Sequence, residues 1–139
     1  SFQEISKKEF IVNYDQNSNS IDITKSIEIV YGLRNFIGNA NKFSKGKVFI
    51  NIKSDSNFTE IIIEDDGEGY PKDVLSKIGE PYIKSFEPFA KSKSGLGLGI
   101  FIGKILLEKN YATILCKNSK NKSGAEVSIK WKNKDLLKL

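Results

Sequence analysis

Three polar residues have the spacing and the chemistry to meet a phosphate group. Asn35, Asn39 and Lys42 lie on one face of a helix that the apolar spacing predicts over residues 25–43. An Asn carbonyl oxygen can ligate Mg²⁺, and a Lys ammonium neutralises phosphate oxygens. A solvated helix face has the same composition, so this pattern needs support from elsewhere in the chain.

Two glycine-containing stretches add groups that suit a nucleotide. Asp65-Asp66-Gly67-Glu68-Gly69 follows an apolar predicted strand. An Asp at a strand end can accept a hydrogen bond from an exocyclic amine such as adenine N6, and nearby glycines let the backbone approach a ligand. Gly95-Leu96-Gly97-Leu98-Gly99 opens a predicted helix, whose N-terminus favours anions. Its spacing differs from both the dinucleotide fingerprint and the P-loop.

The elements that must position these residues alternate between strands and helices. We predict strands at 10–14, 21–24, 48–53, 58–65, 111–117 and 125–131, a short helix at 71–78, and a polar tail from Lys132 that frays. A second long helix begins at Leu98, with Leu98, Ile102, Ile105 and Leu106 on its apolar side. Strands that pair mainly as adjacent hairpins favour an α/β two-layer sandwich, with a mixed, mostly antiparallel sheet covered by about three helices.

Length and composition exclude several classes of function. The chain has 139 residues, which suits one domain over 1–139, and we expect it to be part of a longer protein because it begins at Ser1 without Met. It has no histidine, which removes the commonest general base and metal ligand. The net charge is +5, but Arg34 is the single arginine, so we expect no nucleic-acid partner. The lone Cys116 predicts a reducing compartment, and the lack of a long apolar run predicts a soluble domain. We expect Cys116 to be packed in a strand rather than to serve as a redox sensor.

The order of the motifs resembles one family. An Asn-bearing helix, then D-x-G-x-G, then G-x-G-x-G about 26 residues later is similar to the catalytic ATP-binding domain of bacterial sensor histidine kinases. That domain has a Bergerat-type ATP-binding fold, shared with gyrase, Hsp90 and MutL. Residues 35–43 resemble its N box, 65–69 and 95–99 its two glycine boxes, and 123–127 its closing strand. The stretches EIVYGLRNFIGNA, DDGEGYP and GEPY also resemble the redox-responsive RegB/PrrB type.

The resemblance implies a role for each matched residue with ATP and Mg²⁺ as cofactors. Asn39 would ligate Mg²⁺. Asn35 and Lys42 would contact phosphate and, as the catalytic residues, position it for transfer. The base would lie against Phe43, Asp65, Gly67, Gly69 and Tyr70. The phosphate side would be shaped by Gly95, Leu96, Gly97, Leu98 and Gly99. Residues 79–82 would hold the base of a lid, and the repeat from Phe86 would form the lid, with Lys91 or Lys93 closing on the γ-phosphate.

The resemblance also predicts the reaction. Hydrolytic relatives carry a water-activating Glu four residues before the Mg²⁺ ligand, where this chain has Asn35, which is no base at neutral pH. We therefore expect phosphoryl transfer to a histidine on a separate dimerisation domain, a response regulator downstream, a cytoplasmic location beside a membrane anchor, and a monomeric isolated domain. Two alternatives stay open: an anti-sigma-type protein-serine kinase and a degenerate nucleotide-binding module.

Overall fold

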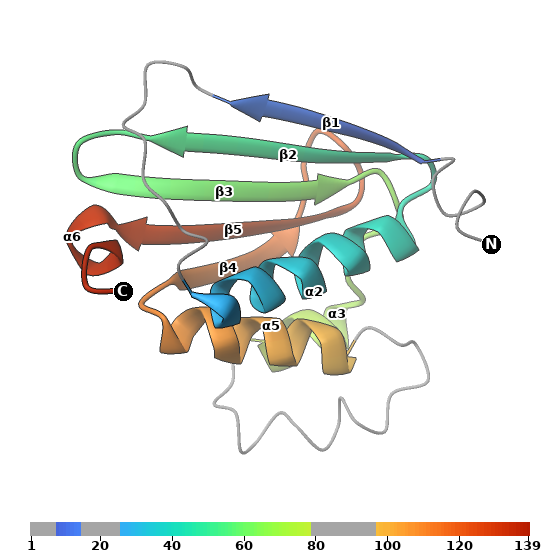
Figure 1. Cartoon of the computed structure of the whole chain (residues 1–139). Coiled ribbons are helices and arrows are strands. Elements are labelled where there is room, and N and C mark those ends of the chain that lie inside the picture. Colours follow the sequence, from blue (N-terminus) through green and yellow to red (C-terminus); the bar gives the residue numbers. More distant parts are fainter. Residues whose placement is uncertain (1–7, 15–25, 79–96) are drawn as a thin grey trace.

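Five strands form one mixed sheet, and helices pack on one of its faces (Figure 1). The computed structural model describes residues 8–14, 26–78 and 97–139. The strands lie in the order β1-β2-β3-β5-β4; β1 pairs with β2 in parallel, and the other neighbours are antiparallel. Their bounds are β1 (Glu9–Tyr14), β2 (Lys47–Ser54), β3 (Phe58–Asp65), β4 (Thr113–Asn118) and β5 (Ala125–Lys132). This confirms the predicted two-layer sandwich with a mostly antiparallel sheet.

The described residues form four helices: α2 (Ile27–Phe43), α3 (Lys72–Ile78), α5 (Gly97–Lys109) and α6 (Asn133–Leu136). Ser26 caps α2, since its Oγ accepts a hydrogen bond from the backbone N–H of Ile29 at 3.3 Å. The expected strand at 21–24 lies outside the described residues. No helix in the described ranges has both the length and the apolar character needed to cross a membrane.

The helices α2 and α5 cross at two glycines. A Cβ on Gly103 would lie 2.9 Å from Phe36 Cε2 and 3.1 Å from the Gly32 carbonyl oxygen. A Cβ on Gly32 would lie 2.6 Å from Leu107 Cγ. Since real side chains do not approach so closely, only glycine permits this crossing, and the crossing sets where α5 begins relative to α2.

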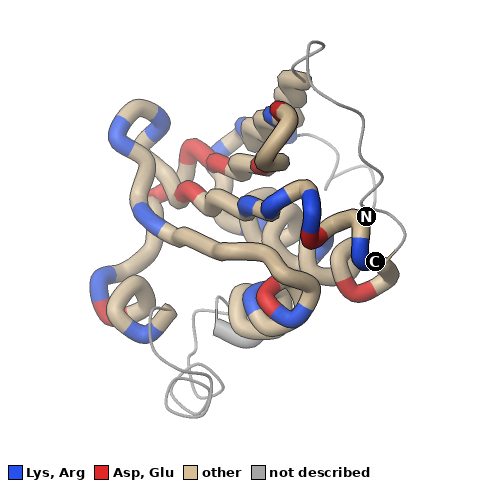
Figure 2. The backbone as a smooth tube through the Cα atoms, turned by 90° about the vertical axis from the view of Figure 1, so that its left-hand side faces the viewer, with Lys and Arg blue, Asp and Glu red and all other residues tan. Residues whose placement is uncertain are grey.

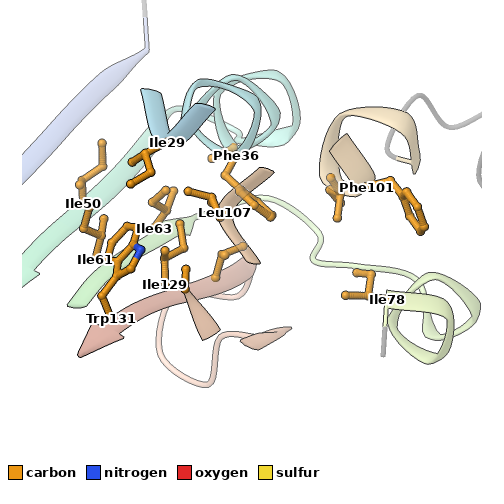
Figure 3. Close-up of a cluster of buried hydrophobic side chains, with 14 of the residues drawn as sticks. Ile29, Phe36, Ile50, Ile61, Ile63, Ile78, Phe101, Leu107, Ile129 and Trp131 are labelled. Carbon is orange, nitrogen blue, oxygen red and sulfur yellow. The ribbon is translucent and has the colours of Figure 1, made fainter. Parts of the chain in front are cut away.

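The hydrophobic core lies between the helices and the sheet. Figure 3 shows Ile29 and Phe36 of α2 near Leu107 of α5 and near the isoleucines of the inner strands. Trp131 is 1% exposed, and its Nε1–H donates to the Asn110 carbonyl at 3.1 Å, so the ring packs in the core with its polar group satisfied. Lysines and acidic residues are interspersed over several elements (Figure 2).

Two predictions about packing are wrong. Ile102 is 39% exposed, and α5 instead buries Ile100, Phe101 and Leu107. The reason is Gly103, which turns toward α2 and shifts the buried side of the helix.

The tail from Lys132 does not fray, because α6 packs at the end of the sheet. Leu136 is buried, and the backbone N–H of Asn133 donates to the Asn57 carbonyl at 2.8 Å. The Asn133 side chain accepts from Thr59 Oγ1 and donates to the Asp55 carbonyl, both at 2.7 Å. A polar residue therefore anchors a segment whose composition predicted fraying.

Candidate functional site

A pocket opens between the C-terminal half of α2 and the ends of the two central strands. Apolar side chains of both layers form most of its wall, and Asn39 and Asp65 supply polar groups. The lining residues are Phe36, Asn39, Ala40, Phe43, Ile63, Asp65, Gly69, Tyr70, Ala125 and Val127. The fold thus brings together predicted residues from the first two motifs, and adds apolar residues that were not predicted for the site, such as Phe36, Ile63 and Val127.

Asp65 places a buried hydrogen-bond acceptor in this pocket. The residue is 4% exposed, and its Oδ1 accepts from the backbone N–H of Gly67 at 2.8 Å and of Ala125 at 3.3 Å. Within the described part of the chain, no hydrogen bond reaches Oδ2. Desolvation raises the pKa of Asp65 although the two backbone N–H groups act in the opposite direction. The carboxylate is thus held through one oxygen, while the other remains for a donor on a ligand.

Glycines surround Asp65 because other backbone groups approach too closely for a side chain. A Cβ on Gly67 would lie 2.1 Å from the Phe43 carbonyl oxygen, and one on Gly124 would lie 2.1 Å from Asp65 Oδ1. Gly69 has a φ of +83°, which L side chains rarely adopt. The sequence predicted Gly67 as room for a base, whereas the structure shows that the end of α2 occupies the space beside it.

Asp66 has a structural role. Its Oδ1 accepts hydrogen bonds from the backbone N–H groups of Lys45, Gly46 and Lys47, at 2.8, 3.1 and 3.2 Å. Desolvation acts to raise the pKa of Asp66, but these backbone donors outweigh it and lower the pKa. This carboxylate ties the loop after α2 to the end of β3, and so fixes the two elements that carry Phe43 and Asp65.

The start of α5 faces the two asparagines of α2. A Cβ on Gly99 would lie 3.8 Å from Asn35 Oδ1 and 4.0 Å from Asn39 Oδ1. Gly97 and Leu98 form the first turn of the same helix. Because a helix N-terminus favours anions, the space beside Asn35 and Asn39 suits phosphate oxygens.

Of the other predicted phosphate contacts, Lys42 is described and does not line the pocket. Lys42 is exposed, and its Nζ lies 5.4 Å from the centroid of the Phe43 ring, outside the pocket lining. Lys91, Lys93, Gly95 and Leu96 lie outside the described residues, as do the two proline-containing repeats of the expected lid.

Tyr70 is held from β4 at two points. Tyr70 is 7% exposed, and its side chain lies beside the Cys116 thiol, close enough for each group to affect the pKa of the other. Its backbone N–H donates to Asn118 Oδ1 at 2.7 Å, and Asn118 Nδ2 donates to its carbonyl at 3.1 Å. Sequence reasoning missed Asn118, because nothing local signals a contact between residues 48 positions apart.

Cys116 is packed rather than reactive. It is half-buried against the core, and burial raises its pKa to about 12. A thiol with so high a pKa stays protonated at neutral pH. This supports the predicted packing role.

The residues present fit ATP and Mg²⁺. The apolar pocket with one buried carboxylate oxygen suits a planar base that carries an amine. Asn39 offers a neutral oxygen ligand to a hard cation that also binds phosphate oxygens.

Comparison with known proteins gives the family. Residues 24–135 match the family model of the histidine kinase-, DNA gyrase B- and HSP90-like ATPases. A sensor histidine kinase RegB of Cereibacter sphaeroides is 37% identical over 103 residues, which cover 70% of this chain and 22% of that protein. A putative NtrY-like sensor histidine kinase of Rickettsia felis is 28% identical over 131 residues, which cover 94% of this chain and 20% of that protein.

Solved structures share the fold. The mycobacterial sensor histidine kinase MprB has a TM-score of 0.69 at 23% identity, over 94% of this chain and 85% of that one. The catalytic domain of histidine kinase ThkA has a TM-score of 0.70 at 16% identity, over 94% and 81%. This chain spans about a fifth of the length of the curated relatives that it matches. The chain belongs to the histidine kinase-, DNA gyrase B- and HSP90-like ATPase family, as a catalytic ATP-binding domain of the kind found in sensor histidine kinases.

Proposed function

We propose that this domain binds Mg-ATP in the described pocket and donates the γ-phosphoryl group to a histidine on another domain of a longer sensor kinase. One observation carries the proposal: the same pocket holds the buried acceptor Asp65 and the neutral oxygen ligand Asn39. Asn39 in turn faces the start of α5. A base end and a phosphate end thus lie in one continuous site.

At the base end, Asp65 accepts a hydrogen bond from the exocyclic amine of adenine through Oδ2. Because Oδ1 is already bonded to Gly67 and Ala125, the carboxylate cannot rotate freely, and the acceptor is preorganised. Phe43 and Tyr70 supply apolar surface beside the base. A guanine presents a carbonyl oxygen where adenine has its amine, and so would oppose the carboxylate.

At the phosphate end, Asn39 holds Mg²⁺, and Asn35 and Lys42 meet the phosphate oxygens. When bound, Mg²⁺ supplies neutralisation of phosphate charge. Lys42 reaches the site only if its side chain turns away from the Phe43 ring. The side chain is exposed and flexible, so this requires no movement of the backbone. Lys91 or Lys93 completes the charge neutralisation when the lid closes.

Phosphoryl transfer is favoured over hydrolysis by Asn35. Its Nδ2 donates to the Tyr31 carbonyl at 2.9 Å, and its Oδ1 is the nearest heavy atom to a Cβ on Gly99. An amide in this place can orient a phosphate but cannot take a proton from water. The chain contains no histidine, so the acceptor has to lie elsewhere.

The remaining assignments follow from the sensor-kinase relatives. We propose that residues 1–139 form a single catalytic domain within a longer kinase, that the acceptor histidine lies on a dimerisation domain, and that a response regulator receives the phosphoryl group. We also propose that the domain works on the cytoplasmic side of a membrane anchor, and that it is a monomer when isolated and binds no nucleic acid.

Calorimetric titration tests the binding half of the proposal. We expect ATP to bind the chain more tightly with Mg²⁺ than without it, and Asn39→Ala to abolish most of that difference. Asp65→Ala should weaken binding both with and without Mg²⁺. Equal affinity of Asn39→Ala and the unaltered chain in the presence of Mg²⁺ would overturn the metal assignment.

The chemistry of the product tests the transfer half. The full-length protein incubated with γ-labelled ATP should acquire a label that acid removes and alkali does not, as for phosphohistidine. An acid-stable label on a serine of a partner would support the anti-sigma-type alternative. A lack of any label, with ATP bound, would support the degenerate binding module.

A further inference from the structure

We propose that Asn118 is a positioning residue for the adenine end of the site, acting through the backbone of Gly69 and Tyr70. This inference rests on the proposed function. Asn118 is the last residue of β4, it is exposed, and it does not line the pocket. Its effect on the nucleotide must therefore pass through the residues that it holds.

The first step of the argument is the double hydrogen bond. Asn118 Oδ1 accepts from the Tyr70 N–H at 2.7 Å, and Nδ2 donates to the Tyr70 carbonyl at 3.1 Å. One side chain therefore satisfies both backbone groups of one residue, as a neighbouring strand would. This pairing holds a segment that follows β3 and lies outside the sheet.

The second step is the conformation of Gly69. Its φ of +83° belongs to a region that favours glycine, and a Cβ there would lie 2.7 Å from Asn118 Oδ1. Glycine also samples many other conformations, so without an external contact this turn has little preference for the observed one. Asn118 is that contact, since it packs on Gly69 and bonds to the next residue.

The third step is the alternation of β4. Cys116 and Asn118 are two residues apart on one strand, so their side chains share a face. The Cys116 thiol lies beside the Tyr70 side chain, and Asn118 makes two hydrogen bonds with the Tyr70 backbone. Tyr70 is held at both ends by one strand, and this places its ring in the pocket wall beside Asp65.

The pairing of β4 with β5 also connects Asn118 to Asp65. Asn118 lies opposite Ala125 on β5, and the backbone N–H of Ala125 donates to Asp65 Oδ1 at 3.3 Å. A shift of Asn118 therefore disturbs both the wall and the acceptor of the base end. Within the described residues, the side-chain hydrogen bonds of Asn118 go to Tyr70 and not to α2 or α5, which form the phosphate end.

The test measures the affinity of the chain for ATP, for ADP and for Mg-tripolyphosphate, which has no base. Asn118→Ala should bind ATP and ADP about tenfold more weakly, the effect of losing roughly two hydrogen bonds, and tripolyphosphate as before. Asn118→Asp keeps the acceptor for the Tyr70 N–H and loses the donor, so its affinity for ATP should be intermediate. The amide resonances of Gly69 and Tyr70 should shift in both variants.

Two control variants separate positioning from general loss of stability. Asn133→Ala removes a comparable pair of hydrogen bonds at the far end of the sheet, and Asn121→Ala alters an exposed residue of the β4–β5 loop. Both should bind ATP as the unaltered chain does. If Asn118→Ala binds ATP within about twofold of the unaltered chain, or loses no more affinity than Asn133→Ala, the inference is overturned and the proposed function stands. If the unaltered chain binds no ATP, the proposed function falls and this inference with it.

Discussion

Gly124 lies so close to Asp65 that a Cβ on the glycine would be 2.1 Å from the carboxylate Oδ1 and 2.1 Å from the Asp65 backbone oxygen. This contact explains why the residue just before β5 is a glycine. The first residue after Gly124 donates its backbone N–H to the same carboxylate oxygen. The start of β5 therefore holds the Asp65 carboxylate in place through both Gly124 and Ala125.

A methyl group at Gly124 should displace Asp65. We expect Gly124→Ala to weaken ATP binding at least tenfold in calorimetry and to lower the free energy of unfolding by about 1–3 kcal/mol, because a buried backbone cannot absorb so short a contact. Gly46→Ala is the matched control, since a Cβ at Gly46 meets nothing within 4 Å. Unchanged ATP affinity in Gly124→Ala would contradict the role given to this contact.

The raised pKa of Asp65 predicts how binding depends on pH. Only the carboxylate can accept from the adenine amine through Oδ2, so affinity should fall as the pH decreases through the pKa of Asp65. Desolvation raises that pKa, so the fall begins above about pH 4, the ordinary carboxyl value. Asp65→Asn has one acceptor oxygen, which the backbone N–H groups of Gly67 and Ala125 take, so it binds ATP more weakly but has no group at this position that titrates. At each pH, we divide the ATP affinity of the unaltered chain by that of Asp65→Asn, which cancels the effect of the titration of ATP itself. This ratio should change with pH only if Asp65 titrates in the range measured.

The same shift has the opposite sign for stability. The folded-state pKa of Asp65 lies above the unfolded value, so its ionisation opposes folding at neutral pH, and this cost is relieved as the pH falls through the folded pKa. Denaturant unfolding of Asp65→Asn should therefore show equal or greater stability than the unaltered chain at neutral pH, with the difference shrinking in acid. A large loss of stability at neutral pH would contradict this account.

Much of the fold could be predicted because its signals are local. Apolar alternation places β2 and β3 within a residue of their observed bounds, and the apolar spacing places the start of α2 two residues before the observed one. The same holds for the site residues that belong to short motifs, such as Asn39 and Asp65.

The rest depends on contacts between distant parts of the chain. No local pattern links the residues that make three of these contacts. They are the parallel pairing of β1 with β2, the crossing of α2 and α5 at Gly32 and Gly103, and the hydrogen bonds of Asn118 to the Tyr70 backbone. Gly103 illustrates the reason. A glycine adds nothing to a hydrophobic pattern, yet its lack of a side chain decides which side of α5 is buried.

The glycine crossing leads to a prediction that links packing to the phosphate end. Gly103→Ala places a methyl group 2.9 Å from Phe36 Cε2 and should push α5 away from α2. We expect a loss of about 1–3 kcal/mol in the free energy of unfolding, measured with urea. Binding of Mg-tripolyphosphate should also weaken, because Gly99 then no longer faces Asn35 and Asn39.

A control for this variant lies on α2 itself. Gly38 is exposed, and a Cβ there meets nothing within 4 Å, so Gly38→Ala should raise the free energy of unfolding by about 0.5–1 kcal/mol through helix propensity alone. Its affinity for Mg-ATP should not change. If Gly103→Ala is as stable as the unaltered chain, the close crossing of the two helices is not required.

The high pKa of Cys116 predicts a thiol that is inert in the folded state. Burial raises this pKa to about 12, so the thiolate that reacts with disulfide reagents is scarce at neutral pH. Labelling with an aromatic disulfide should be slow in buffer and should accelerate many-fold in denaturing urea, where the pKa returns to about 8.5. Cys116→Ala, which leaves no thiol in the chain, gives the baseline. Since Cys116 touches Tyr70 and Tyr70 lines the pocket, saturating ATP should slow the labelling further. Fast labelling of the folded chain would show instead that β4 opens readily, and that Tyr70 is held less firmly than its two bonds to Asn118 indicate.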